Sequence, residues 1–362
     1  MTREISSPTR IRKLMDLPDV SRSRVIVRDI EQQFSNECTR IVAAEFFKAG
    51  NRYPPLDAQK LFSRHWDAFR AAFEIHRRPG LLLMALDELS GEIGRVWIEV
   101  TADKLRSITV GRHARCDLVI PEQRSEVSLR HLLLLARRGA DERIRTRLIE
   151  LRTETAFSDE SGRLLNAAVC EDTAFLRLGS LVLVLLPTSA APVAASADDA
   201  YAKIPKRLFL DERTGFAPPG EQLAALADRR DRFTSSTAIS SVAAPEALRR
   251  SRSPEPAESV ATLRLHYGRQ RTEIAIAATT LERGILIGRY SRCDLGFDLS
   301  CAERLSRVHC LIIQDHDGPV AIDTASSNRM TVDDQELRVI ALTDGTHWDL
   351  ANELELTWLA PA

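Results

Sequence analysis

The sequence predicts a mainly β protein in which two β-sandwich domains are joined by a long flexible linker and preceded by a small α-helical region. After about residue 94, apolar residues recur at every second position in many short runs, which is the periodicity of strands. Between two sets of such runs lies a stretch rich in Ala, Ser and Pro that offers little to fill a core. We therefore expect five divisions: a flexible N-terminus (1–22), a helical region (23–93), a first sandwich (94–188), the linker (189–259) and a second sandwich (260–362).

The helical region is predicted from apolar residues that recur every three to five positions. This spacing covers residues 30–46 and 62–73, and Asp57 is a candidate N-cap for the second of these helices. A third short helix is expected from Leu81 to Leu89, and another within the linker over 221–232. We interpret the aromatic stripe of the helical region as core or docking surface, because no motif there carries chemistry.

An internal repeat marks both predicted sandwiches. The segment GRHARCDL at 111–118 matches GRYSRCDL at 288–295 in six of eight positions. Each segment is followed by a Ser-x-x-His motif, at 128–131 and at 306–309, and then by an apolar run. Because the same order extends over whole domains, the repeat indicates two copies of one fold.

The second copy resembles the forkhead-associated (FHA) domain family, because Gly-Arg, Cys-Asp, Ser-x-x-His and an Asn-containing turn follow one another in the family's order. Its turn reads Ser326-Ser327-Asn328, where family members usually carry Ser-Thr-Asn-Gly, and Arg329 stands in place of the last glycine. The resemblance implies a β-sandwich whose loops at one end bind phosphothreonine in an extended peptide. It also implies partners that contain phosphothreonine and belong to a Ser/Thr kinase pathway.

The residues of the second copy suit this chemistry. Phosphothreonine carries close to two negative charges, so its receptor needs a permanent cation and fixed donors. Arg289 offers a planar fork for two phosphate oxygens, and Gly288 allows the chain to leave its strand in a tight turn. The resemblance implies that Ser306 contacts the phosphate directly, and Arg307 can add a second positive group.

Three further residues complete the predicted site. The amide of Asn328, with Ser327 beside it, would hold the main chain of the ligand. His309 could serve as an acid or base, but the resemblance implies that it braces the loops by hydrogen bonding, and we expect this structural role.

The first copy keeps Gly111, Arg112, Ser128 and His131 but is expected to be degenerate. Aligning its later turn places residues 158–162 (SDESG) where Ser-Thr-Asn-Gly would stand, so the Asn is missing and two carboxylates would lie near the phosphate. We interpret this copy as a structural or protein-contact module. The alternative is a weakened phosphate site formed by Arg112, Ser128 and Arg130.

Other classes of function find less support in the sequence. Cys293, Cys301, His309 and Cys310 lack the CxxC pairing typical of zinc sites, so we expect neither a metal nor a cofactor. Walker, nucleophile-elbow, HExxH and kinase motifs are absent, so we expect no enzyme. Basic and acidic residues number 50 and 51, which disfavours nucleic acid and membrane surfaces as partners.

The sequence also predicts the cellular location of the protein and allows two hypotheses about its role. The first 20 residues contain no signal-peptide core and the longest apolar run, 181–186, is far shorter than a membrane span, so we expect a soluble protein. The resemblance to bacterial signalling proteins of the FHA family implies that it is cytoplasmic. The leading hypothesis is an adaptor that reads phosphothreonine through its second copy. The alternative is a scaffold that uses the same fold and binds its partners independently of phosphate.

Overall fold

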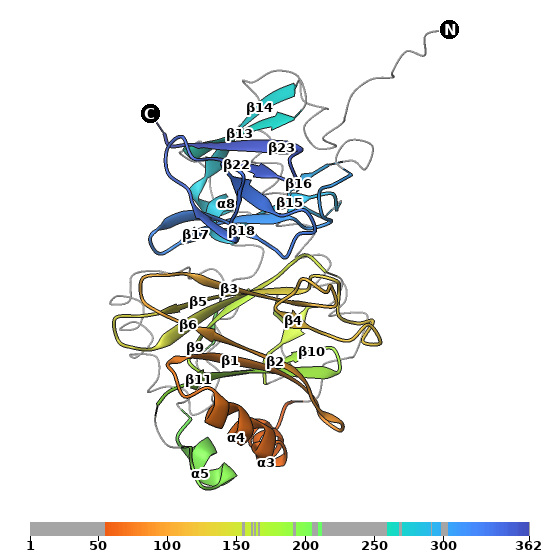
Figure 1. Ribbon diagram of the computed structural model, residues 1–362, viewed down its shortest axis with the longest axis vertical. Coiled ribbons are helices and arrows are strands. Elements are labelled where there is room, and N and C mark those ends of the chain that lie inside the picture. Colours follow the sequence, from red (N-terminus) through yellow and green to blue (C-terminus); the bar gives the residue numbers. More distant parts are fainter. Residues whose placement is uncertain are drawn as a thin grey trace, which may run out of the picture. The chain divides into compact units, whose positions relative to one another are not determined.

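The structure is a computed structural model, and it describes residues 55–153, 156–160, 162, 164–165, 167–190, 193–204, 209–211, 259–267, 270–290, 292–297 and 303–361. The described residues form two compact units, 55–211 and 259–361, and each unit is a β-sandwich with its own apolar core (Figure 1). The predicted fold class is thereby confirmed. No helix in the described ranges is long and apolar enough to cross a bilayer.

The N-terminal unit consists of two six-stranded sheets with helices against one of them. The sheets have the strand orders β2-β1-β11-β10-β7-β8 and β12-β9-β6-β5-β3-β4. The elements of this unit are α3 (Ala58–Arg64), α4 (Trp66–Ile75), β1 (Gly80–Asp87), β2 (Gly91–Glu99), β3 (Arg106–Gly111), β4 (Leu118–Val119), β5 (Leu132–Arg138), β6 (Ile144–Glu150), β7 (Phe157–Ser158), β8 (Leu164–Leu165), β9 (Ala167–Glu171), β10 (Ala174–Leu178), β11 (Leu181–Thr188), α5 (Ala197–Ala202) and β12 (Phe209–Asp211).

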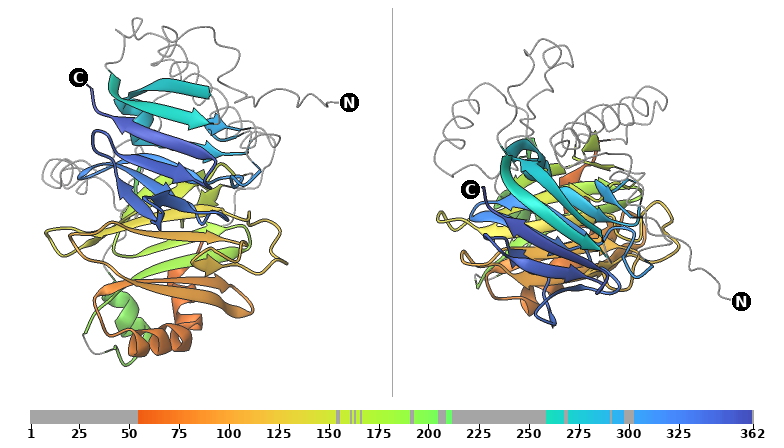
Figure 2. Two further views of the ribbon diagram at one scale, coloured as in Figure 1. Left: turned by 45° about the horizontal axis from the view of Figure 1, so that its top comes forward. Right: turned by 90° about the horizontal axis from the view of Figure 1, so that it is seen from above.

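The C-terminal unit has a six-stranded sheet, β14-β13-β23-β22-β19-β20, and a five-stranded sheet, β16-β15-β17-β18-β21 (Figure 2). Its elements are β13 (Ser259–Tyr267), β14 (Gln270–Ala277), α8 (Ala278–Arg283), β15 (Ile285–Gly288), β16 (Leu295–Gly296), β17 (Cys310–Asp315), β18 (Gly318–Asp323), β19 (Met330–Val332), β20 (Gln335–Glu336), β21 (Val339–Ala341), β22 (His347–Leu350) and β23 (Leu354–Leu359).

The two units repeat one topology strand by strand. In the N-terminal unit β1 lies between β2 and β11, and in the C-terminal unit β13 lies between β14 and β23. The second sheets agree as well, because β9-β6-β5-β3-β4 follows the same order as β21-β18-β17-β15-β16. The internal repeat therefore extends from β1 to β11 and from β13 to β23, with β12 as an additional edge strand of the N-terminal unit.

Strand β1 is buried on both faces, and this corrects the prediction of a helix from Leu81 to Leu89 and of a sandwich that begins only after it. Leu81 and Leu83 belong to the sandwich core, whereas Leu82 and Met84 pack in a second cluster with α3 and α4. A strand covered on both faces shows a continuous apolar run without the alternation of a half-exposed strand. Such a run cannot be distinguished from a buried helix by its periodicity.

The helices of the N-terminal unit agree in part with the sequence. The Asp57 carboxylate accepts a hydrogen bond from the backbone N–H of Lys60 at 2.9 Å, which confirms the predicted N-cap of α3. The predicted linker must be shortened, because α5 packs its Tyr201 against Phe62, with ring centroids 5.6 Å apart, and β12 pairs with β9. The helices predicted over 30–46 and 221–232 lie outside the described residues.

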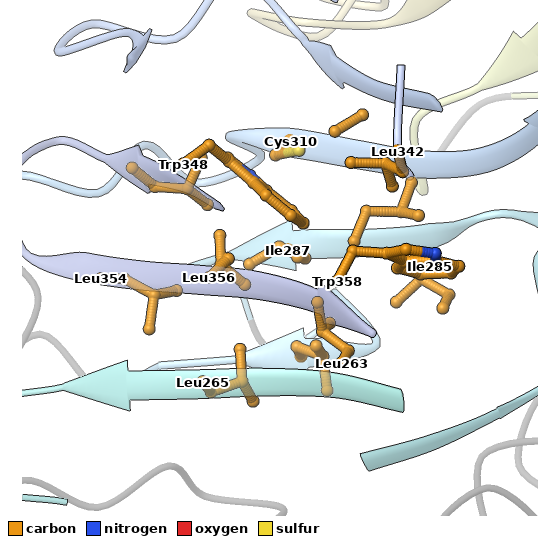
Figure 3. Close-up of a cluster of buried hydrophobic side chains, with 14 of the residues drawn as sticks. Leu263, Leu265, Ile285, Ile287, Cys310, Leu342, Trp348, Leu354, Leu356 and Trp358 are labelled. Atoms are coloured by element: carbon orange, nitrogen blue, oxygen red, sulfur yellow. The ribbon is translucent and has the colours of Figure 1, made fainter. Parts of the chain in front are cut away.

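Strand pairing in the C-terminal unit brings three loops together at one end of the sandwich, above a well-packed core. Trp348 is fully buried between the sheets, among side chains such as Ile287, Cys310 and Leu356 (Figure 3). In the five-stranded sheet, Cys310 at the start of β17 pairs with Ile287 near the end of β15 and with Asp323 at the end of β18. The chain segments after β15, before β17 and after β18 therefore meet at one end of the sandwich.

Candidate functional site

Three loops at this end of the C-terminal unit carry all the predicted binding residues. We call them the arginine loop (289–294), the serine loop (303–309) and the asparagine loop (324–329). Arg307, Ser327 and Asn328 are exposed, Arg289 is half-buried, and Ser306 is buried. The structure thus brings together the five residues that the sequence indicated.

The arginine loop is fixed to the serine loop by main-chain contacts. The N–H of Arg289 donates to the carbonyl of Ser306 at 3.0 Å, and the N–H of Tyr290 donates to the carbonyl of Arg307 at 2.9 Å. A Cβ on Gly288 would lie 2.3 Å from the carbonyl oxygen of Arg307, so only glycine permits this approach. The glycine is therefore needed for close packing of the two loops, and its φ is not in the left-handed region.

The guanidinium of Arg289 is held at one end and available at the other. Its Nε donates to the carbonyl of Leu305 in the serine loop. Within the described part of the chain, neither of its two Nη nitrogens has an ion-pair or hydrogen-bond partner. A guanidinium fixed through Nε presents its remaining N–H groups as a fork for two oxygens of one oxyanion.

A buried aspartate supports the arginine loop, and sequence reasoning assigned it no role. The Asp294 carboxylate accepts a hydrogen bond from the N–H of Leu286 in β15 at 2.8 Å. The equivalent Asp117 accepts from the N–H of Thr109 at 2.7 Å and from its hydroxyl at 2.9 Å. The recurrence of Cys-Asp in both copies could have identified this structural role.

His309 connects the serine loop to the asparagine loop and is fully buried. Its Nδ1 accepts a hydrogen bond from the N–H of Ser306 at 3.1 Å. Nε2 therefore carries the proton and donates to the carbonyl of Arg329 at 2.9 Å. Both ring nitrogens are occupied by main-chain partners, which suits an imidazole that positions loops.

The asparagine loop is held by Asp323, at the end of β18, and by contacts with the serine loop. The Asp323 carboxylate accepts from the N–H and the hydroxyl of Ser326 at 2.7 and 2.6 Å. The hydroxyl oxygen of Ser306 accepts from the N–H of Ser327 at 2.8 Å, and Nδ2 of Asn328 donates to the carbonyl of Arg304 at 2.6 Å. These contacts tie the asparagine loop to the serine loop.

Arg329 takes the conformation that the family's usual glycine adopts freely. Its φ is 62°, in the left-handed region that costs a residue with a Cβ roughly 1–2 kcal/mol. Its guanidinium forms an ion pair with Glu336 in β20, and its carbonyl accepts from His309. The turn is therefore kept despite the substitution, and Asn328 stays beside the serine loop.

The N-terminal unit reproduces the first two loops almost contact for contact. The Nε of Arg112 donates to the carbonyl of Val127, and the N–H of Arg112 donates to the carbonyl of Ser128 at 3.1 Å. A Cβ on Gly111 would lie 2.3 Å from the carbonyl oxygen of Leu129. Nδ1 of His131 accepts from the N–H of Ser128 at 3.0 Å.

Side-chain exposure nevertheless differs between the copies. Arg112 and Ser128 are half-buried, and Arg130 is buried. The counterpart of the exposed Arg307 is the half-buried Leu129, so the first copy lacks this second arginine. Burial raises the pKa of the Cys116 thiol to about 11, so it stays protonated and donates to the carbonyl of Leu129 at 3.4 Å.

The third loop of the N-terminal unit lies elsewhere than the sequence alignment placed it. Leu132 pairs with Glu150 as Cys310 pairs with Asp323, so the turn equivalent to the asparagine loop starts at Leu151 and not at Ser158. Asp159 follows β7, within its hairpin with β8, and this hairpin corresponds to that of β19 and β20. The two carboxylates therefore do not occupy the phosphate turn, and this argument for a degenerate first copy was wrong.

The loop that does occupy this place still lacks an asparagine. The chain reads Thr153-Glu154-Thr155 where the second copy has Ser326-Ser327-Asn328, and positions 154 and 155 are not described. Glu150 accepts a hydrogen bond from the N–H of Thr153, as Asp323 does from Ser326. Burial raises the pKa of the Glu150 carboxyl to about 7, although its contacts with Thr153 and Arg152 act in the opposite direction.

No group of three His, Cys, Asp or Glu side chains that could hold a metal ion occurs within the described residues. Of the residues considered for zinc, Cys293 and Cys310 are buried free thiols, and Cys301 lies outside the described residues. The Sγ of Cys293 donates to the carbonyl of Arg307 at 3.2 Å, so this thiol contributes to the contact between the arginine and serine loops.

Residues 285–350 match the family model of the FHA domain, which confirms the resemblance drawn from the second copy. FHA domains are non-enzymatic modules that bind phosphothreonine in Ser/Thr kinase signalling. The chain matches no curated protein.

Several solved FHA structures are similar to this chain. The Rv1747 FHA-1 domain of Mycobacterium tuberculosis is 21% identical, with 28% of this chain and 98% of that chain covered and a TM-score of 0.23. The FHA domain of the CT664 protein from Chlamydia trachomatis is 15% identical, with coverages of 30% and 96% and a TM-score of 0.24. EmbR of Mycobacterium tuberculosis, solved in complex with a low affinity phosphopeptide, is 23% identical, with coverages of 40% and 38% and a TM-score of 0.23.

Proposed function

We propose that the C-terminal sandwich reads phosphothreonine peptides and that the chain is a non-catalytic adaptor in Ser/Thr kinase signalling. The observation that supports this most is the guanidinium of Arg289. It is fixed through Nε to the carbonyl of Leu305, and its Nη nitrogens have no partner among the described residues. This is the arrangement that a phosphate dianion requires.

The neighbouring residues extend the same chemistry. Arg307 is exposed, and its side chain forms no hydrogen bond or ion pair with a described residue, so it can add a second positive charge to the phosphate. Ser306 directly precedes Arg307, its carbonyl accepts from the N–H of Arg289, and its hydroxyl oxygen accepts from the N–H of Ser327, so it connects the three loops. Asn328 is exposed at the rim, where its amide can pair with the main chain of an extended ligand.

The proposal is tested by titrating the full chain with a degenerate phosphothreonine peptide pool and with the same pool without phosphate. We expect binding of the phosphorylated pool alone. Arg289→Ala removes a charge-assisted contact of about 1.5–3 kcal/mol and should weaken binding at least about tenfold. Arg289→Lys keeps the charge but loses the fork, so it should also weaken binding.

Arg283 provides the matched control, because it is an exposed arginine at the end of α8, at the opposite end of β15 from the arginine loop. Arg283→Ala should bind as the unmodified chain does. Equal binding of Arg289→Ala and Arg283→Ala would refute the reader function. The variant Arg112→Ala, made in parallel, shows whether the first copy contributes to the measured affinity.

A scaffold that binds partners without phosphate is the second candidate. It is favoured by one observation, namely that the Asn328 amide nitrogen is already engaged with the carbonyl of Arg304. Under this alternative, capture of a partner by the full chain is unaffected when the partner is treated with phosphatase. The reader function requires that phosphatase treatment abolish the capture.

A further inference from the structure

Strand β14 is the longest edge strand in the described part of the C-terminal unit. The other edge strands of its two sheets, β20, β16 and β21, contain only two or three residues. β14 contains eight, and among the described strands it pairs with β13 alone (Figure 1). Because an edge strand is paired on one side, about half of its backbone N–H and C=O groups point away from the sheet and can bind a further strand.

The side chains of β14 do not block such pairing. Edge strands are commonly protected by proline, by lysine or by a charge that points into the core. β14 reads QRTEIAIA and contains neither proline nor lysine. Its charged residues, Arg271 and Glu273, lie on the face away from the core, to which Ile274 belongs. The register shift between β13 and β14 falls at residues 259–261, at the other end of the pairing from Arg271.

The two charged side chains of β14 can each bind a further partner. Nε of Arg264 in β13 and Nη2 of Arg271 both donate to Oε1 of Glu273, at 2.8 and 3.4 Å. Oε2 of Glu273 forms no hydrogen bond or ion pair with a described residue. The side chain of Arg271 is 59% exposed and that of Glu273 is 36% exposed, so both can be reached from outside the unit.

The sequence of β14 is complementary to itself. When two identical strands pair antiparallel about a two-fold axis at Thr272, Arg271 of each copy is directly opposite Glu273 of the other. Thr272 is then opposite Thr272 of the second copy. Opposite charges and pairs of threonines are both favourable across antiparallel strands. Self-pairing of β14 is therefore favoured in one register.

We propose that the chain forms a homodimer in which the β14 strands of two copies pair antiparallel about Thr272 and join their six-stranded sheets. The partner that fits this edge is thus a second copy of the chain. No residue of β14 belongs to the arginine, serine or asparagine loops, so the inference does not depend on the reader function. If the reader function holds, the dimer carries two such sites and binds a doubly phosphorylated partner with increased avidity.

Analytical ultracentrifugation of the full chain measures the dimer directly. We expect the unmodified chain to dimerise as its concentration rises to about 0.1 mM. Arg271→Glu and Glu273→Arg each place like charges opposite one another twice in the dimer, so each should weaken the dimer at least about tenfold. Urea unfolding checks that the variants remain folded. The matched control is Arg70→Glu, which reverses an exposed arginine paired with Glu74 in the N-terminal unit and should leave the dimer unchanged.

A mixture of the two single variants is the sharper test. In a heterodimer of Arg271→Glu with Glu273→Arg, both facing pairs again have opposite charges, so the mixture should dimerise more tightly than either variant alone. The double variant Arg271→Glu/Glu273→Arg should dimerise by itself for the same reason. The proposal is refuted if the unmodified chain stays monomeric up to about 0.1 mM. It is also refuted if Arg271→Glu dimerises as tightly as Arg70→Glu does, or if neither the mixture nor the double variant restores the dimer.

Discussion

Replacing Gly288 with alanine tests whether the contact between the arginine and serine loops forms the site. A Cβ at this position would lie 2.3 Å from the carbonyl oxygen of Arg307 and 2.9 Å from that of Ser306. Both atoms belong to the main chain, so a side-chain rotation cannot relieve the clash. An ordinary contact begins near 3.4 Å, so the loops must separate by about 1 Å.

This separation breaks the contacts that position the phosphate fork. The hydrogen bonds from Arg289 N–H to Ser306 and from Tyr290 N–H to Arg307 are 3.0 and 2.9 Å long and cannot tolerate it. We expect Gly288→Ala to lower the free energy of unfolding by about 1–3 kcal/mol. We expect phosphopeptide affinity to fall at least about tenfold, because a charge-assisted contact is misplaced.

The matched control is Gly296→Ala in β16, where the nearest heavy atom would be 3.4 Å from the new Cβ and φ is not in the left-handed region. Urea unfolding and titration with the phosphothreonine pool measure both variants in the full chain. The control should behave as the unmodified chain does. If Gly288→Ala unfolds and binds like Gly296→Ala, the loop contact is not what forms the site.

Two further predictions concern buried groups, His309 in the C-terminal unit and Glu150 in the N-terminal unit. His309→Ala removes the side-chain acceptor of the Ser306 N–H and one of the two donors to the carbonyl of Arg329, which keeps the N–H of Ala351. It should lower the free energy of unfolding by about 1–3 kcal/mol and weaken phosphopeptide binding. Unchanged stability would show that the imidazole does not brace the loops. Burial raises the pKa of Glu150 from 4.5 to about 7, so the folded chain holds this proton more tightly than the unfolded chain does. Its contribution to stability is fully present below pH 4.5 and is lost as the pH rises toward 7, by up to about 3 kcal/mol. The difference in unfolding free energy between the chain and Glu150→Gln, measured from pH 4.5 to 8, should follow this trend, and a difference that does not vary with pH contradicts it.

The second-copy residues could be predicted because they lie in short motifs at strand ends. Arg289 follows the apolar run 285–287 after Gly288, and Ser306 begins the Ser-x-x-His motif that precedes the run 311–313, so their place in the fold followed from the order of the runs. What the sequence could not show is the network behind them. Glu353, whose carboxylate accepts from the N–H of Arg304, is 49 residues away in sequence, and Asn328 is 24 residues from the Arg304 carbonyl to which it donates.

Two of the errors in the sequence-based prediction have the same physical origin, which is burial that the pattern of apolar residues does not reveal. Strand β1 is covered by helices on its outer face, and its continuous apolar run therefore resembled a helix. Residues 193–204 and 209–211 were assigned to the linker because the whole stretch is rich in Ala, Ser and Pro, yet Tyr201 packs against Phe62. The turn at 158–162 was aligned by residue type, whereas its true counterpart is defined by the pairing of β5 with β6.

The two copies differ in the third loop and at Arg307, whose counterpart in the first copy is Leu129. The first two loops keep the same contacts around Arg112 and Arg289, so each unit can present a guanidinium fork. In the second copy Nε2 of His309 donates to the carbonyl of Arg329, whereas in the first copy Nε2 of His131 lies 3.4 Å from the hydroxyl of Thr153.

The sequence of this third loop also lacks an amide that could hold the main chain of a peptide. A ligand of the first copy would therefore depend on contacts to the anion itself, which are available to any phosphorylated partner. Selectivity for a peptide sequence requires contacts beside the phosphate. Asn328, the residue that we propose for such a contact, belongs to the second copy.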